Sequence, residues 1–371
     1  MKKTDSALRS TKDKMQQEPL KSWQLLEIVQ HLSPPSGLSG CRKKINFSAD
    51  GISIKSILKP DGKKAHFYSG LLKCGHTWTC PFCSESAARI TEAKVNAVID
   101  KSIENGLSVS HVVFTIYHER SDSLASLFTQ FKNVIRTMKN RPTFKKWKSK
   151  VKYIGDIKAL EIRLGANGWH LHAHYCFIHE IFQSDQDLWE LFYMFKNACI
   201  GITARPPSEK AFFARGGFFD DAAKYITKWS PGKELTQDSK KDRSEGLSFW
   251  GILREVYRGN KYYQARALEY ITDTKNQRRI VFSDGLKAWA DIVPDFNPED
   301  KTEDELGKTV YELTPNQWHA ICHQECRAEI LAMFDGGFYE AAIHMIMIIE
   351  ERTLGRYKPP KGGNLPCQMN S

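Results

Sequence analysis

The sequence lacks any long apolar run. The most apolar late run, residues 341–349, is short and is interrupted by His344, whereas a membrane span needs about 20 apolar residues. The basic first residues are not followed by the apolar stretch of an export signal. We therefore expect a cytoplasmic protein with no membrane partner.

Acidic residues are scarce relative to basic ones. The 371 residues include 43 Asp and Glu against 54 Lys and Arg, which gives a formal net charge of +11. With 41% hydrophobic and 26% charged residues, the composition is that of a globular protein and excludes a disordered or fibrous chain. A basic surplus of this size favours a polyanionic partner such as nucleic acid.

The pattern along the chain predicts an α+β protein in four parts. Residues 1–40 are polar and are predicted to form a flexible arm. Residues 41–104 contain a cysteine-rich segment that runs into a helical pattern. Residues 105–293 predict a domain with a central antiparallel sheet flanked by helices, and residues 294–371 a helical extension with a disordered tail.

The elements of the third part follow from apolar periodicity. A β-branched run predicts a buried strand, and two further strands flank a Gly-Ala-Asn-Gly turn typical of a hairpin. Apolar residues at helical spacing predict the helices. The expected elements are a helix at 84–103, strands at 111–117, 151–164 and 169–178, and helices at 124–138, 186–199 and 219–229.

Three histidines alternate along the second strand of the hairpin, at His170, His172 and His174. Side chains two residues apart on a strand share a face, so the three imidazoles project together, opposite an apolar face. Aligned imidazoles would repel one another if protonated, but as neutral groups they suit a divalent metal ion. The spacing therefore predicts a metal site.

Glu161, on the preceding strand, is a further candidate ligand. If residues 167–168 form the two-residue turn, Glu161 lies opposite His174; if residues 166–167 form it, Glu161 lies opposite His172. Either register places the carboxylate beside a histidine on the same face. Imidazoles with one carboxylate leave coordination positions open, which suits a catalytic Mg²⁺ or Mn²⁺.

A predicted helix carries the candidate nucleophile. Asp221, Tyr225 and Lys228 share one face at i, i+4 and i+7. A tyrosyl oxygen can attack a phosphodiester, Lys228 can stabilise the resulting negative charge, and Asp221 can activate water as a general base. The alternative is an ordinary core tyrosine on a half-buried helix.

The cysteines predict a structural zinc site. Cys74, Cys80 and Cys83 have the spacing of a zinc knuckle, and either Cys41 or His76 can supply the fourth ligand. Buried free thiols are the alternative.

A lysine-rich stretch is the candidate DNA-binding segment. It interleaves aromatic and basic side chains, as proteins that bind single strands do, although a solvated loop after a helix would have the same composition. Its predicted DNA-binding residues are Lys145, Lys146, Trp147, Lys148 and Lys150.

Several segments resemble, in order, the motifs of the rolling-circle replication initiators of bacterial plasmids, which belong to the HUH endonuclease superfamily. They are FTIY at 114–117, NGWHLHAH at 167–174, AKYITK at 223–228, KELT at 233–236 and FSDGLK at 282–287. Leu171 replaces the usual proline of the metal motif. The resemblance covers about residues 41–290, and the histidine block is its most specific part.

The resemblance implies an HUH-type fold and strand-specific nicking of a plasmid's double-strand origin. Tyr225 would become joined to the 5′ phosphate and leave a free 3′-OH for a host polymerase. Asp221 matches the position of an acidic residue, more often Glu in the family, that uses water to end a replication round. The family pattern favours His172 and His174 as the metal pair and Cys41 as the fourth zinc ligand.

The implied partners are origin DNA, single-stranded DNA, a host helicase and further copies of the chain. Two other functions remain open at this point. A single-strand DNA transposase of the same superfamily would use the same histidines and tyrosine. A zinc-containing nucleic-acid-binding regulator would use them without catalysis.

Overall fold

The computed structural model describes residues 20–33, 37–46, 51–58, 62–217, 246–292 and 307–355. These residues form two compact units: one lies within His76–Pro298, and the other combines Lys21–Gly75 with the chain after residue 299. Among the helices of the described ranges, none is long and apolar enough to cross a membrane.

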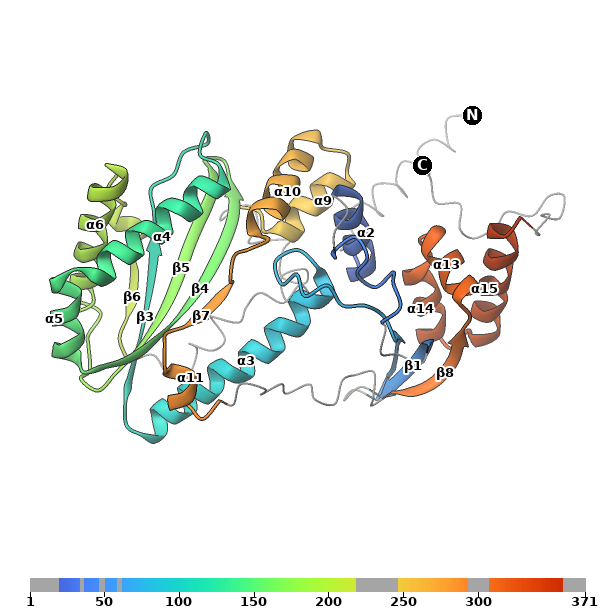
Figure 1. Cartoon of the computed structure of the whole chain (residues 1–371), viewed down its shortest axis with the longest axis horizontal. Coiled ribbons are helices and arrows are strands. Elements are labelled where there is room, and N and C mark those ends of the chain that lie inside the picture. Colours follow the sequence, from blue (N-terminus) through green and yellow to red (C-terminus); the bar gives the residue numbers. More distant parts are fainter. Residues whose placement is uncertain are drawn as a thin grey trace, which may run out of the picture. The chain divides into compact units, whose positions relative to one another are not determined.

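The first unit is built around a five-stranded sheet in which all neighbouring strands are antiparallel. Figure 1 shows the strands in their spatial order: β6 (Phe213–Arg215), β3 (Ser108–Thr115), β5 (Gly168–His179), β4 (Tyr153–Gly165) and β7 (Ile280–Phe282). The predicted mixed class with an antiparallel sheet is confirmed, and the three long strands begin within three residues of their predicted starts.

The β4–β5 hairpin settles the register that the sequence left open. Its ladder closes between Gly165 and Gly168, which leaves residues 166–167 as the loop, and Glu161 lies opposite His172. The second register is therefore confirmed, and a turn at residues 167–168 is wrong.

Gly168 is the first residue of β5 and not a residue of the turn. Its φ is +89°, and a Cβ at this position would lie 2.9 Å from the backbone of Arg120. Only glycine combines this left-handed backbone with so close an approach.

Three helices cover one face of the sheet. They are α4 (Leu124–Asn140), α5 (Pro142–Val151) and α6 (Trp189–Thr203). Phe195 of α6 stacks on Phe114 of β3 with ring centroids 4.6 Å apart. Trp147 of α5 lies edge-on to Phe177 of β5 at 5.4 Å. These contacts form an aromatic core, which leaves that face without access to solvent.

The opposite face is covered along only part of its length. The covering helices are α3 (Pro81–Glu104) and α11 (Leu286–Trp289). Val98 and Ile99 of α3 and Leu286 of α11 form one buried cluster with Ile157 of β4 and Cys176 of β5. The cluster extends to Cys176, opposite His111, and to Ala159, opposite His174, and it contains none of the histidines.

Two more helices pack near the start of α4. They are α9 (Phe249–Tyr257) and α10 (Lys261–Thr274). On α10, Glu269 Oε1 accepts a hydrogen bond from the Leu124 amide and Asp273 Oδ2 accepts one from the Ala125 amide, both at 2.9 Å. The two carboxylates satisfy amides that the first helical turn leaves unpaired, and they fix α10 to α4.

The second unit packs helices on a small sheet of order β2-β1-β8. Its elements are α2 (Ser22–Leu32), β1 (Ile52–Leu58), β2 (Lys64–Ser69), β8 (Lys308–Leu313), α13 (Pro315–His323), α14 (Arg327–Asp335) and α15 (Tyr339–Thr353). Tyr68 lies at its centre, 5.5 Å from the ring of Trp23 and 4.9 Å from that of Trp318. The buried Arg327 donates to Glu27 Oε1 at 2.9 Å.

This unit corrects the prediction of a flexible arm over residues 1–40. Residues 22–32 form α2, whose apolar side chains Leu25, Leu26 and Val29 are fully buried. The helical extension is present, but it includes the strand β8, which pairs with β1 far away in the sequence. The short apolar stretches of both segments are stabilised by packing against each other within this unit.

Candidate functional site

The predicted metal ligands lie on the same sheet face as the buried cluster of α3 and α11, and His174 among them is itself buried. His172 lies opposite Thr115 of β3 and Glu161 of β4, and His174 lies one step further along β5. Glu161 Oε2 and His174 Nε2 are 3.0 Å apart. The fold therefore brings together the carboxylate and the imidazoles that the sequence selected.

The arrangement fits a divalent cation. Two ligand atoms on adjacent vertices of an octahedral Mg²⁺ site, each about 2.1 Å from the ion, lie about 3.0 Å apart. Glu161 Oε2 and His174 Nε2 are hydrogen-bonded at this distance, so a cation bound by both atoms would replace the proton between them. Thr115 Oγ1 lies 2.8 Å from His172 Nδ1 and orients that ring, as neighbours of metal-bound histidines do.

The electrostatics also favour a cation. Burial alone would raise the pKa of Glu161, but the hydrogen bond from His174 and the charge of Arg163 hold this pKa far below its usual range. Burial, together with neighbouring histidines, lowers the pKa values of His170 and His172 to about 4. At neutral pH Glu161 is therefore ionised and His170 and His172 are neutral, the forms that bind metal.

Two further histidines belong to this cluster and were missed by the sequence analysis. His111 of β3 is buried, stacks on His174 at 5.4 Å, and places its Nε2 3.2 Å from His174 Nδ1. His118, just after β3, lies edge-on to His170 at 3.9 Å. The sequence gives little sign of them, because each is a single histidine beside the FTIY motif. The pairing of β3 with β5 brings them to the site.

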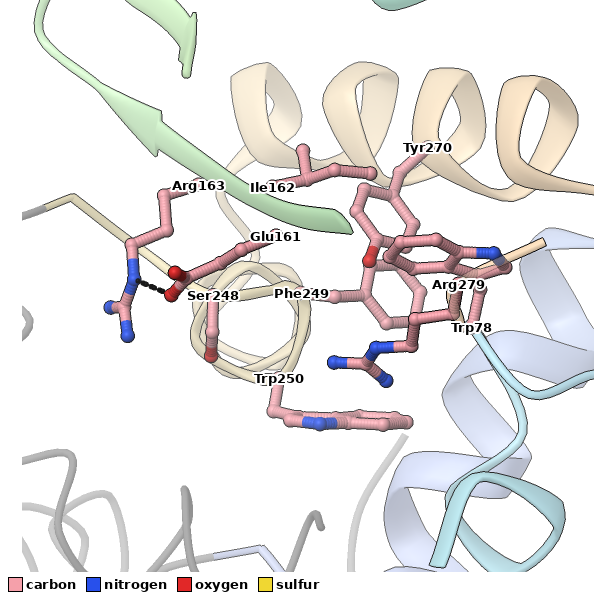
Figure 2. A pocket seen from close by; sticks show the side chains of 9 residues that line it. All are labelled: Trp78, Glu161, Ile162, Arg163, Ser248, Phe249, Trp250, Tyr270 and Arg279. Carbon is pink, nitrogen blue, oxygen red and sulfur yellow. Dashed lines mark hydrogen bonds and ion pairs between the residues drawn. The ribbon is translucent and has the colours of Figure 1, made fainter. Parts of the chain in front are cut away.

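A narrow pocket adjoins the carboxylate. Figure 2 shows Glu161 and Arg163, joined by an ion pair of 2.9 Å, beside Ser248 at the start of α9. Apart from Ile162, the rest of the lining is aromatic or basic and consists of Trp78, Phe249, Trp250, Tyr270 and Arg279. Arg279 lies over the ring of Trp78 at 4.9 Å. Phe249 of α9 stacks on Tyr270 of α10 with ring centroids 4.4 Å apart, which packs the two helices together.

The predicted nucleophile helix at 219–229 and the KELT segment lie outside the described residues. This applies to Tyr225, Asp221 and Lys228.

The FSDGLK segment is described and has a structural role. Ser283 Oγ accepts a hydrogen bond from the Asp156 amide at 2.9 Å, and a Cβ on Gly155 would lie 2.8 Å from Ser283 and Leu286.

The four predicted zinc ligands converge. The sulfurs of Cys41, Cys74, Cys80 and Cys83 all lie within 4.8 Å of one another. This group contains Cys41 and not His76. Within the described ranges, no other group of three or more such side chains has all its ligand atoms this close together. The ligand atoms of Glu161 and the histidines are therefore not all as close together as the four sulfurs.

The lysine-rich segment differs from its prediction. It is the helix α5, and Trp147 is only 1% exposed, in a stack with Phe144. A buried indole cannot stack on a base, so the aromatic part of the predicted DNA contact is wrong. Lys145, Lys146 and Lys150 are exposed, Lys150 pairs with Glu190 at 3.2 Å, and Lys148 lies over the Tyr153 ring.

Comparison with known proteins gives partial matches. No family model matches the chain, and no solved structure matches it. The protein named "Protein rep" from Streptomyces lividans is 27% identical over 132 residues, which covers 28% of this chain and 29% of that protein. The "Neomycin resistance protein" from Streptomyces cyanogenus is 31% identical over 131 residues, covering 28% and 30%. The chain spans about three tenths of the length of these curated relatives.

Proposed function

We propose that this protein initiates rolling-circle replication of a plasmid. It would be an HUH-type, metal-dependent endonuclease and strand transferase that nicks one strand of its origin. The observation that carries the proposal is the placement of Glu161 Oε2 3.0 Å from His174 Nε2, beside the oriented His172. The partial similarity to a protein named rep supports the same function.

The site residues would hold Mg²⁺ or Mn²⁺. His172, His174 and Glu161 would be the ligands, with His170 next to them on the same face. The bound cation would supply positive charge to a phosphate oxygen of the scissile bond. Arg163, held at Glu161, would help keep the carboxylate ionised and in place.

The covalent step would be a transesterification. The Tyr225 oxygen attacks the phosphorus and loses its proton; a new tyrosyl–phosphate bond forms, and the bond from phosphorus to the 3′ oxygen breaks. The leaving oxygen takes up a proton and becomes the free 3′-OH primer. Lys228 would stabilise the phenolate or phosphate charge. Asp221 would later activate water to end the round.

The primer would serve a host polymerase. A host helicase and further copies of this chain would act at the same origin. We also propose that Cys41, Cys74, Cys80 and Cys83 bind structural Zn²⁺, because four sulfurs within 4.8 Å of one another fit a tetrahedral zinc ion.

Cleavage of labelled DNA tests the nuclease. The purified protein is incubated with Mn²⁺ and single-stranded oligonucleotides that tile both strands of the DNA flanking its own coding sequence. We expect one nick and a protein–DNA adduct that mass spectrometry maps to Tyr225. Tyr225→Phe should abolish both, whereas Tyr257→Phe, at an exposed position on α9, should leave them unchanged.

The metal variants separate catalysis from folding. His172→Ala and His174→Ala should lose cleavage but retain binding to duplex origin DNA. Loss of duplex binding as well would show that these histidines maintain the fold. Binding without cleavage by the wild type would favour the non-catalytic regulator, and excision of a flanked element would favour the transposase.

Metal analysis of the purified protein tests the zinc site. We expect about one zinc per chain, and Cys80→Ser should lower both zinc content and melting temperature. Cys199→Ser, at a buried thiol outside the cluster, is the control for loss of a packed sulfur.

A further inference from the structure

The edge strand β6 places an aromatic side chain in line with the histidines. Phe213 lies opposite Val113 of β3, and Val113 lies opposite His174 of β5. Phe213 and His174 therefore occupy the same level of the sheet, two strands apart, which corresponds to about 10 Å. Both point to the same face, because directly paired residues share a face.

Contacts confirm this line of rings. The Phe213 ring lies 5.4 Å from the ring of His111, and His111 stacks on His174 at the same distance with an interplanar angle of 14°. Phe213 nevertheless remains 45% exposed. Its ring ends the row of three and presents its outer side to solvent at the edge of the proposed metal site.

The surroundings of this ring are basic. Lys210 and Arg215 are exposed on either side of Phe213 in the sequence. The nearby carboxylate of Glu209, in η1 (Glu209–Ala211), pairs with Lys196 at 3.2 Å. Close by, Thr115 Oγ1 lies 3.5 Å from the carbonyl of Ala211, so the segment before β6 reaches the His172 ring.

A second exposed aromatic ring follows β3. Tyr117 is 44% exposed, and the guanidinium of Arg205 lies over its ring at 5.6 Å. The Tyr117 hydroxyl donates to Glu119 Oε1 at 3.1 Å, and Arg205 donates to Asp122 at 3.0 Å, so acidic groups already pair with this ring and its cation. Phe213 has the exposed ring and the neighbouring exposed cations with which proteins bind single-stranded nucleic acid.

We propose that Phe213 is a stacking platform for a base of single-stranded DNA next to the scissile phosphate, with Lys210 and Arg215 contacting the backbone. This inference rests on the proposed function and assigns its DNA contact to β6, in place of the buried Trp147. The simpler role for Phe213 is to shield His111 from water, and that role needs only an apolar side chain.

Anisotropy of a fluorescein-labelled 20-residue oligo-dT, measured in EDTA, tests the platform without cleavage. Loss of one base–aromatic stack weakens binding about 5- to 150-fold, and we expect Phe213→Ala to fall in this range. Phe213→Leu keeps an apolar cover over His111 but cannot stack, so it should bind as weakly as the alanine variant. Phe213→Trp should bind like the wild type, and so should Tyr257→Ala, which removes an exposed ring on α9.

The outcomes are distinct from those of the cleavage assay. Wild-type affinity in Phe213→Leu, or in Phe213→Ala, would overturn the platform, and so would failure of the wild type to bind oligo-dT. Circular dichroism and melting temperatures establish that each variant is folded; if Phe213→Ala is not, the leucine and tryptophan variants decide. Weakened binding with no Tyr225 adduct in the wild type would retain the platform and reject the nuclease.

Discussion

The ion pair between Lys139 of α4 and Asp156 of β4 offers a test of how the sheet is held. The Asp156 side chain is 4% exposed and accepts hydrogen bonds from Lys139 Nζ at 2.7 and 2.9 Å, as well as from the Tyr153 hydroxyl. Replacing Lys139 with methionine keeps most of the side-chain volume but leaves a buried carboxylate without its cation.

The expected cost follows from that burial. Removing one partner of a buried pair costs about 3–5 kcal/mol, and the lower end applies here because Lys139 is 30% exposed and Tyr153 still donates. For a unit of this size, about 3 kcal/mol corresponds to a melting temperature lower by about 6–12 °C. Chemical and thermal denaturation at pH 7 measure both quantities.

The double variant makes the test decisive. Adding Asp156→Asn to Lys139→Met should restore most of the stability at pH 7, because it removes the carboxylate that the single variant leaves buried without its cation. A single variant as stable as the wild type, or a double variant no more stable than the single one, would refute a buried pair.

The remaining predictions concern the core, the metal site and acid stability. Trp147→Ala should lower the unfolding free energy by about 3–5 kcal/mol, and Trp147→Phe by less than about 1.5 kcal/mol. Neither variant should change the affinity for oligo-dT. Weaker oligo-dT binding by a folded Trp147→Phe would contradict the placement of Trp147 in the core. His111→Leu should lower the Mn²⁺ affinity about 10- to 100-fold in calorimetric titration, because His111 orients His174. His111→Gln should have an intermediate affinity. Wild-type Mn²⁺ affinity in His111→Leu would reject this role. Burial lowers the pKa of His179, whose Nε2 meets Ser110 Oγ at 2.8 Å, so its contribution to stability is present above about pH 6.5 and is lost as the pH falls, by up to about 1.4 kcal/mol per pH unit. As the pH is lowered from 7.5 to 5.5, the unfolding free energy of His179→Asn, measured by chemical denaturation, should fall less steeply than that of the wild type. An unchanged slope would contradict the contribution of His179.

Much of the first unit could be predicted because its signals are local. The β-branched run of β3, the helical spacing of α4 and the Gly-Ala-Asn-Gly turn each specify an element within a few residues. The second unit was harder. Helix α2 and strand β8 are short. Strand β8 pairs with β1 about 250–260 residues away, and Glu27 of α2 pairs with Arg327, 300 residues away, contacts that periodicity cannot reveal.

The sequence alone determined that His170, His172 and His174 share a face, because strand geometry has a period of two. It also identified Cys74, Cys80 and Cys83 by their spacing, and the family resemblance favoured Cys41 over His76 as the fourth ligand. The tertiary structure decided which histidine faces Glu161, since either turn was compatible with the sequence and only the closed ladder fixes the register. It also brought His111 to His174 and Phe213 to the edge of the site, and it buried Trp147, because packing against distant strands determines which side chains remain exposed.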